Sequence, residues 1–398
     1  MANKQIDCFS TNIKFWKFLG IWPENVHSHY KYYSHLFLAT FVYLYWILFS
    51  INFIYLPRQL DTWIGEMIFY FTDISCLSKV LTFRLMHDHI AKLLNMLESD
   101  IFQPATDEGL KIIADVKKFN VKYWKIMAVV SVTSHFTHIF SPLLAHLISH
   151  VKLELPVSRY SFIPEKVKEQ VAYPLYFYQT IGMHFLMWYN INIDTFFLAI
   201  MMFAISQLEI LNLKLRNITS AAKLPRESRA DAQVDVQRND EYYVHKLTEC
   251  IIHYTEVSKF CELIQNIFSI TLFIQFSVAS CIICICLFRF TLPAPLDYYI
   301  FLATYTFIMV IQIMLPCWFG TRIMDKSYEL SMAVYSCDWT ARSRRFKTNL
   351  RLFVERTNRP LSIIGGLMFT LSLSTFTSIM NSAYSFFTLL RHMQSREG

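Results

Sequence analysis

The chain has 398 residues, of which 54% are hydrophobic and only 17% are charged, and its mean hydropathy is +0.32. An ordinary soluble domain carries about 25% charged residues, and 35 Phe with 22 Tyr exceed what one packed core needs. This composition excludes a disordered chain and indicates that lipid is the solvent.

Long charge-free runs predict transmembrane helices, because about 20 apolar residues in a helix cross a bilayer core of about 30 Å. Six runs, each of at least 24 residues, contain no Asp, Glu, Lys or Arg: 32–57, 126–151, 170–193, 263–288, 298–321 and 360–390. A seventh apolar stretch, 62–83, carries Glu66, Asp73 and Lys79, so we expect it to face protein or water rather than lipid. The sequence therefore predicts an all-α membrane protein with seven transmembrane helices.

The distribution of positive charge predicts an orientation. The loops on one side of the seven spans carry 28 Lys and Arg residues, and those on the other side carry 8. Because positive residues are retained in the cytosol, the N-terminus is expected in the cytosol and the C-terminus outside the cell. The same rule accounts for the net charge of +7, so no nucleic-acid partner is expected.

The cytosolic connections are expected to continue the spans as helices. An apolar stripe with a few charges covers 205–216, and a charged helix resumes from Glu241. The polar tract 223–241 between them lacks aromatic residues until its end, which favours a loop.

No catalytic or cofactor-binding motif is present. The eight glycines form neither a dinucleotide-binding nor a phosphate-binding loop, and neither H-E-x-x-H nor G-x-S-x-G occurs. His135 and His138 have a spacing that could hold zinc, but their span contains no carboxylate, which favours hydrogen-bonded histidines. The chain is therefore expected to be no enzyme and to bind no cofactor or metal.

Polar and aromatic residues recur at helical spacing in the outer halves of four spans. They are Phe69, Tyr70 and Asp73, then His135 and His138, then Phe177, His184 and Trp188, then Phe301 and Tyr305. One interpretation is that these aromatics only pack helix against helix. The other is that they enclose an apolar cavity open to the outside, which suits a small, mostly hydrophobic ligand.

Two charges lie deeper in the predicted bundle. Lys79 and Asp194 occupy similar depths on the second and fourth spans. Because an unpaired charge is costly in a membrane, we expect them to form a buried structural pair rather than a ligand site.

The C-terminal third carries motifs in a specific order. They are Pro316-Cys317-Trp318-Phe319-Gly320, Ser327-Tyr328-Glu329-Leu330, Trp339, Arg359-Pro360-Leu361, Gly365, Phe376 and Ser382-Ala383-Tyr384-Ser385-Phe386-Phe387. Together with Phe-Leu-Gly-Ile-Trp-Pro at 18–23 and the inverted orientation, they resemble the insect odorant receptor family along the whole chain.

The resemblance implies a subunit of a ligand-gated, nonselective cation channel. Such a subunit, tuned to an odorant, assembles as a heterotetramer with a shared co-receptor in the plasma membrane of an olfactory neuron's dendrite. Its partners are then a small volatile odorant, the co-receptor, membrane lipid and permeating cations. The odorant is expected in the outer half of the bundle, which agrees with the second interpretation of the aromatic residues.

The resemblance also divides the chain. It implies a cytosolic N-terminal segment (1–31), a six-helix ligand-binding region (32–325), a cytosolic anchor helix (326–359), and a pore-lining last helix with an extracellular tail (360–398). Residues assigned to the pore are Tyr384, Phe387, Thr388 and Arg391, with Phe387 as the gate, and those assigned to assembly in the anchor are Tyr335 and Trp339.

Some alternatives stay open. Arg391 either hinders cation flow at the outer mouth or extends to water and complements the helix C-terminus. A gustatory receptor of the same superfamily has a similar architecture. A G-protein-coupled chemoreceptor has the same number of spans, but the charge asymmetry opposes it.

Overall fold

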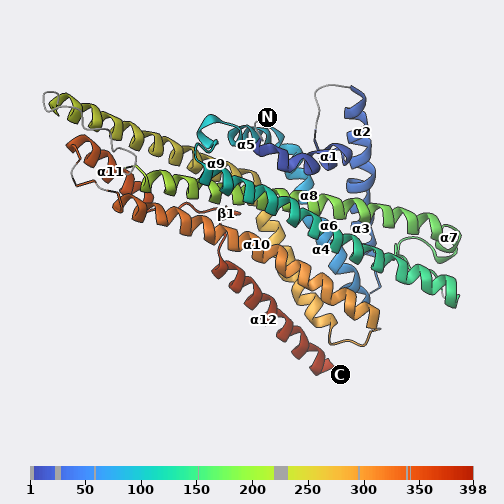
Figure 1. Ribbon diagram of the computed structural model, residues 1–398. Coiled ribbons are helices and arrows are strands. Elements are labelled where there is room, and N and C mark those ends of the chain that lie inside the picture. Colours follow the sequence, from blue (N-terminus) through green and yellow to red (C-terminus); the bar gives the residue numbers. More distant parts are fainter. Residues whose placement is uncertain are drawn as a thin grey trace.

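Helices make up almost all of the molecule (Figure 1). The structure, a computed structural model, describes residues 4–22, 28–57, 60–150, 152–218, 232–294, 296–337, 339–340 and 342–397. The predicted all-α class is confirmed.

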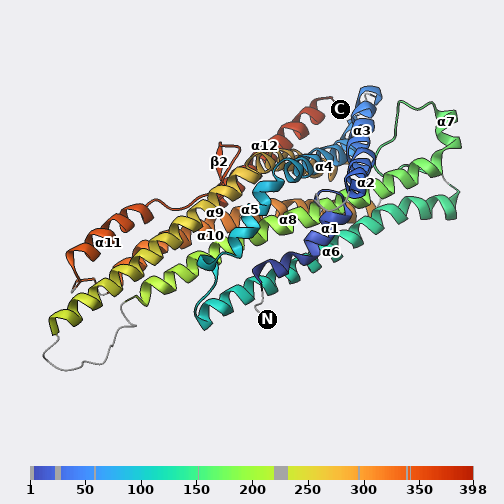
Figure 2. The same ribbon diagram turned by 90° about the horizontal axis from the view of Figure 1, so that it is seen from above.

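Four very long helices run side by side along the molecule (Figures 1 and 2). They are α6 (Asp107–Ser149), α8 (Ala172–Arg216), α9 (Ala232–Arg289) and α10 (Leu296–Tyr335), of 43, 45, 58 and 40 residues. Because about 20 residues cross a bilayer, each helix continues well beyond one span, as the sequence predicted for the cytosolic extensions.

The remaining helices are shorter and surround these four. The first predicted span is one run of α2 (Ser28–Leu38), a π-helical turn η2 (Ala39–Tyr43) and α3 (Leu44–Tyr55). The others are η1 (Gln5–Phe9), α1 (Ser10–Phe18), α4 (Leu60–Leu85), α5 (His87–Leu97), η3 (Asp100–Phe102), α7 (Glu165–Gln170), α11 (Arg344–Thr357) and α12 (Leu373–Glu397).

Helix α8 lies at the centre of the core. From Phe196 to Leu211 nearly every one of its side chains is buried, whichever way it points. The N-terminal segment closes one side, where Trp16 is fully buried and packs edge-on to Phe196, 5.0 Å from the ring of Phe83 on α4. A helix that is apolar all round is buried on all sides, which explains why α8 has no lipid-facing stripe at this level.

Five helices in the described residues are long and apolar enough to cross a membrane: His29–Tyr55, Asp107–Ile148, Ala172–Arg216, Asp240–Arg289 and Tyr298–Tyr335. The other two predicted spans, on α4 and α12, carry too many polar residues to qualify by composition. On α4 the polar side chains face protein, as predicted, because Glu66, Asp73 and Lys79 are all buried.

Two segments differ from the sequence-based expectations. The loop predicted at 223–241 is already helical from Ala232, while 219–231 lie outside the described residues. The charge-free run 360–390 does not begin as a helix: β1 (Ile364–Gly365) pairs antiparallel with β2 (Phe369–Thr370) before α12 starts. Gly366 and Leu367, both with φ of 58°, make the left-handed turn between the strands.

The chain after this hairpin crosses α10 at close range. A Cβ atom added to Gly320 would overlap the backbone carbonyl of Leu371, and the Leu373 amide donates to Thr321 Oγ1 over 3.0 Å. Gly320 therefore allows α12 to begin against α10.

We predict that Gly320→Ala lowers the stability of the α10–α12 contact by about 1–3 kcal/mol, since backbone must move to admit the methyl group. Gly65→Ala on α4 is the matched control, because nothing lies within 4 Å of its added Cβ. Thermal unfolding of the two purified variants in detergent should show a lower midpoint for Gly320→Ala alone. Equal midpoints contradict the prediction.

Candidate functional site

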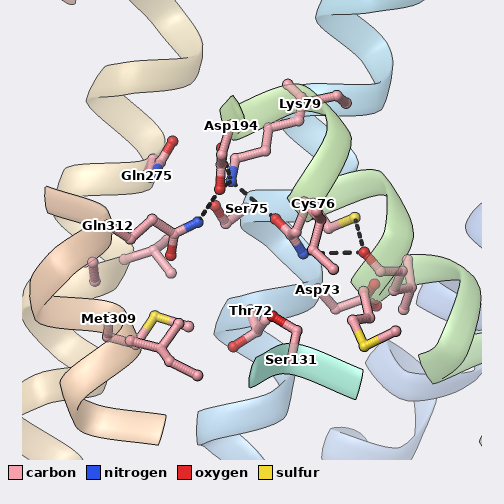
Figure 3. A pocket seen from close by; sticks show the side chains of 18 of the residues that line it. Thr72, Asp73, Ser75, Cys76, Lys79, Ser131, Asp194, Gln275, Met309 and Gln312 are labelled. Atoms are coloured by element: carbon pink, nitrogen blue, oxygen red, sulfur yellow. Dashed lines mark hydrogen bonds and ion pairs between the residues drawn. The ribbon is translucent and has the colours of Figure 1, made fainter. Parts of the chain in front are cut away.

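A cavity of about 190 Å³ lies among α3, α4, α6, α8, α9 and α10 (Figure 3). Most side chains in its wall are apolar, and about a third are polar or charged. A cavity of about 150 Å³ holds a benzene molecule, so this one has room for a molecule slightly larger than benzene. Size and lining are those of a site for a small, mostly hydrophobic molecule.

Five of the ten residues singled out in the sequence line this cavity. Phe69 and Asp73 come from α4, His135 from α6, and Phe301 and Tyr305 from α10. The ring of Phe301 lies 6.2 Å from that of Phe69 and 5.7 Å from that of Tyr305. These rings form one continuous aromatic wall across two helices.

The other five lie around the cavity, outside its lining. The Tyr70 hydroxyl is 3.2 Å from Ser50 Oγ, and His138 stacks behind Phe301, with its Nε2 2.7 Å from the carbonyl of Pro156. Trp188 donates to His184 Nε2 over 3.0 Å. Phe177 is 57% exposed on the outside of the bundle.

A polar network forms one end of the cavity (Figure 3). Lys79 Nζ lies 2.7 Å from Asp194 Oδ1 and donates to Asn190 Oδ1 over 2.9 Å, while Gln312 on α10 donates to Asp194 Oδ2. Lys79 is fully buried, so the predicted ion pair is confirmed. All four side chains also line the cavity.

Sequence reasoning missed two members of this network. Asn190 and Gln312 lie in charge-free spans, where a primary amide is the strongest remaining hydrogen-bonding side chain. Their matching depth with Lys79 was the signal that could have found them.

An outer segment, residues 152–163, connects α6 to α7 and closes over the bundle. The buried Glu66 carboxylate accepts hydrogen bonds from the Arg159 amide over 3.0 Å, from Ser158 Oγ over 3.3 Å and from Asn52. Gln179 Oε1 accepts from the amide of Val157 over 3.1 Å, and Val157 lines the cavity. Asn52 on α3 also accepts from the Ser161 amide over 2.7 Å, so α3, α4 and α8 all hold this segment against the cavity.

The start of the outer segment is tied to α7 by exposed charges. Lys152 Nζ donates to Glu165 over 2.8 Å and to Glu169 over 3.0 Å. The hydrogen bonds from Lys152 and then Lys168 hold the pKa of Glu165 below its ordinary value.

Helix α12 stands apart from most of the molecule and contacts α9 and α10 (Figure 1). Ala383 is fully buried, whereas Ser374, Ser378, Asn381 and Ser385 are exposed. At 100° per residue these four lie on the side of the helix opposite Ala383, and we call them the polar stripe. They were not selected from the sequence, although their spacing of three and four residues was visible there.

The four pore residues selected from the sequence lie near this stripe. Thr388 continues it, while Tyr384, Phe387 and Arg391 follow one flank of the helix. Tyr384 is 60% exposed, Arg391 is exposed, and Phe387 and Thr388 are half-buried.

The C-terminal end of α10 carries an exposed apolar face. Tyr328, Met332 and Tyr335, spaced by four and three residues, are each about 60% exposed. Trp339 lies just beyond and is half-buried. The predicted anchor 326–359 thus contains the end of α10 and, after a break, α11; Asp338 and Ala341 in that break lie outside the described residues.

The described residues contain no group of three or more His, Cys, Asp or Glu that could hold a metal ion.

The sequence matches a family model described as 7tm Odorant receptor over residues 59–384. Odorant receptor 67a of Drosophila melanogaster is 23% identical over 265 residues, which cover 65% of this chain and 62% of that receptor. Odorant receptor 2a of the same species is 32% identical over 154 residues, 38% of each chain. The chain thus spans less than two thirds of the length of the curated relatives it matches. These matches favour the odorant receptors over the gustatory alternative.

The fold is similar to that of solved structures. The insect olfactory receptor OR5 from Machilis hrabei in complex with eugenol superimposes with a TM-score of 0.80 at 15% identity, covering 97% of this chain and 100% of that one. Another structure of the same receptor gives a TM-score of 0.78 at 16% identity. At this identity the likeness shows the fold alone.

We predict that Lys79→Met and Asp194→Asn each lower the free energy of unfolding by about 3–5 kcal/mol, because each leaves the charge of its partner buried and unpaired. The double variant should lose much less than the sum of the two, because no unpaired charge remains. Thermal unfolding of the three purified variants measures this cycle. Strictly additive losses contradict an energetic coupling between the two side chains.

Proposed function

This chain belongs to the 7tm odorant receptor family, and from that premise we propose that it is the odorant-tuned subunit of a ligand-gated, nonselective cation channel. Its relatives are chemosensory receptors and no enzymes. The observation that carries the proposal is the cavity of about 190 Å³, with its aromatic wall and mostly apolar lining. A volatile molecule is small and mostly apolar, which such a cavity suits.

The proposed odorant site comprises the predicted residues that line the cavity. Phe69, Phe301 and Tyr305 supply apolar contact area, and Asp73 and His135 supply polar contacts. Tyr70, His138, His184 and Trp188 support this wall from behind. The OR5 complex with eugenol is consistent with a ligand of this size in the family.

The proposed orientation is a cytosolic N-terminus and an extracellular C-terminus. The 28 to 8 division of Lys and Arg between the two sides supports it. The cavity then lies in the outer half of the bundle, and the exposed apolar face of α10 lies in the cytosol. The proposed location is the plasma membrane of the sensory dendrite.

The proposed pore is lined by α12. Its polar stripe points away from its own subunit, and polar side chains in a membrane are favourable where they line a water-filled path. Thr388 lies in this lining, Tyr384 and Phe387 flank it, and Phe387 is the proposed constriction. Arg391 at the outer end extends to water, and the conductance of Arg391→Leu channels measures whether it also hinders cations.

The proposed partner is the shared co-receptor subunit, in a heterotetramer. Tyr328, Met332 and Tyr335 leave a large apolar face uncovered at the cytosolic end, and such faces mark protein contacts. Tyr335 and Trp339 therefore carry assembly in this proposal.

The function is tested by recording odorant-evoked currents from cells that express this chain with and without a co-receptor subunit. We predict that Phe301→Ala raises the half-effective concentration of an active odorant by about fivefold or more, because it removes a ring from the cavity wall. Phe177→Ala is the matched control, since that ring is exposed. No odorant-evoked current in either setting contradicts the function, and a larger effect of Phe177→Ala contradicts the proposed site.

The pore is tested by cysteine substitution in a background that carries Cys281→Ser, because Cys281 is exposed while the other eight cysteines are buried. Ser378→Cys and Ser385→Cys channels should lose current when a charged, membrane-impermeant thiol reagent is added from outside. Ala383→Cys should not, because that position is buried against its own subunit. Reaction of the Ala383→Cys channels alone contradicts the proposed pore lining. Reaction of the serine positions only from the cytosolic side contradicts the proposed orientation.

A further inference from the structure

Asp73 is the most anomalous side chain of the cavity. It is 3% exposed, it lines the cavity, and neither of its carboxyl oxygens has a hydrogen-bond partner among the described residues. No dashed line reaches it in Figure 3, although the nearby Lys79 and Asp194 are fully paired. A buried carboxyl group without a partner is costly, so this position is explained by a polar partner that enters the cavity.

Three tyrosines, Tyr45, Tyr160 and Tyr178, interact electrostatically with the Asp73 carboxyl. The Tyr178 hydroxyl donates to the carbonyl of Thr40 over 2.9 Å, and Tyr160 does not line the cavity. The Tyr45 hydroxyl is buried, lines the cavity and has no partner among the described residues. One donor and one acceptor are thus left unused at one part of the wall.

The packing of α3 on α8 fixes Tyr45 there. A Cβ atom added to Gly182 would overlap the ring of Tyr45, so the ring lies directly on the helix backbone. Asp73 lies on α4, which the Lys79–Asp194 pair ties to α8. Neither group is on a loop that could turn to the surface.

We propose that Asp73 and Tyr45 form a subsite for the hydroxyl group of a small alcohol or phenol, which donates to the Asp73 carboxyl and accepts from the Tyr45 phenol. This inference rests on the proposed function and names the class of odorant. A hydroxyl is the neutral group that both donates and accepts through one atom. An ether, ester or ketone leaves Asp73 without a donor, and an ammonium, which has donors only, leaves the Tyr45 hydroxyl without an acceptor.

The probes are four molecules with one skeleton: phenylethanol, its methyl ether, ethylbenzene and phenylethylamine. The same four groups on an unbranched hexyl chain form a second set, which removes dependence on the aromatic ring. Binding is measured as the stabilisation of the purified full chain in lipid nanodiscs, which requires no channel opening. We expect half-effective concentrations at least about tenfold lower for the alcohol than for its ether and hydrocarbon.

Tyr45→Phe and Asp73→Leu should each reduce this preference to about threefold or less. Tyr178→Phe is the matched control, because its hydroxyl already has a partner and does not line the cavity; it should keep the full preference. Asp73→Leu removes an unpartnered carboxyl, so it is expected to fold at least as well as the parent chain.

The inference is overturned if alcohol and ether bind equally, if the amine binds best, if no alcohol binds, or if the preference survives in both variants. Equal binding of alcohol and ether would mean that Asp73 and Tyr45 are satisfied by each other or by water. Recording currents with the same probes separates this inference from the proposed function. Alcohol-selective binding without any current rejects the function and keeps the subsite, whereas equal currents for all probes keep the function and reject the subsite.

Discussion

A fully buried lysine inside a bilayer requires a partner, and the arrangement of the bundle follows from how this chain supplies one. Lys79 on α4 is held by Asp194 and Asn190 on α8, and Gln312 on α10 completes the shell around the carboxylate. One ammonium group thus fixes the depth and rotation of three helices. Apolar packing alone tolerates small slips between helices, whereas a buried charge without its partner costs several kcal/mol, of the order of 3–5. The pair is therefore the strongest determinant of register in this part of the fold.

The same network links the cavity to the last helix. Gln312 lies on α10 beside the cavity, and two turns further along that helix Gly320 receives the backbone of Leu371, directly before α12. In the proposed channel, α10, which is one helix between these two points, would carry a displacement at Gln312 to the start of α12. A ligand shifts an equilibrium only by its difference in affinity between two states. In the proposed channel, that difference arises where a ligand touches α10, at Phe301, Tyr305 and the Gln312 network.

The sequence was sufficient for the spans and for the Lys79–Asp194 pair, because composition and depth along a helix are local properties. It was insufficient for the cavity lining. Phe69 and Phe177 are equivalent as sequence features, yet one lines the cavity and the other is exposed. The difference is the rotation of each helix about its axis, which depends on contacts with distant residues such as those that Trp16 and Tyr45 make on α8. The hairpin at 364–370 was missed for a related reason, because absence of charge does not distinguish a span from a short hairpin. The local signal was the pair Gly365-Gly366, which permits the left-handed turn.

Helix α12 places a final constraint on the molecule. One side, at Ala383, is buried by its own subunit, and the opposite side carries four polar residues that are exposed. The serine hydroxyls are partly satisfied by carbonyls of their own helix, as in the 3.0 Å bond from Ser378 to Ser374, and the exposed side-chain amide of Asn381 is costlier to place in lipid. The flanks of the helix, with Tyr384, Phe386 and Leu389, are apolar and equally exposed. A single helix that needs water on one stripe and apolar contact on both flanks finds both environments when several copies surround a common axis. In the proposed channel, the fold of one subunit is therefore complete only within an assembly.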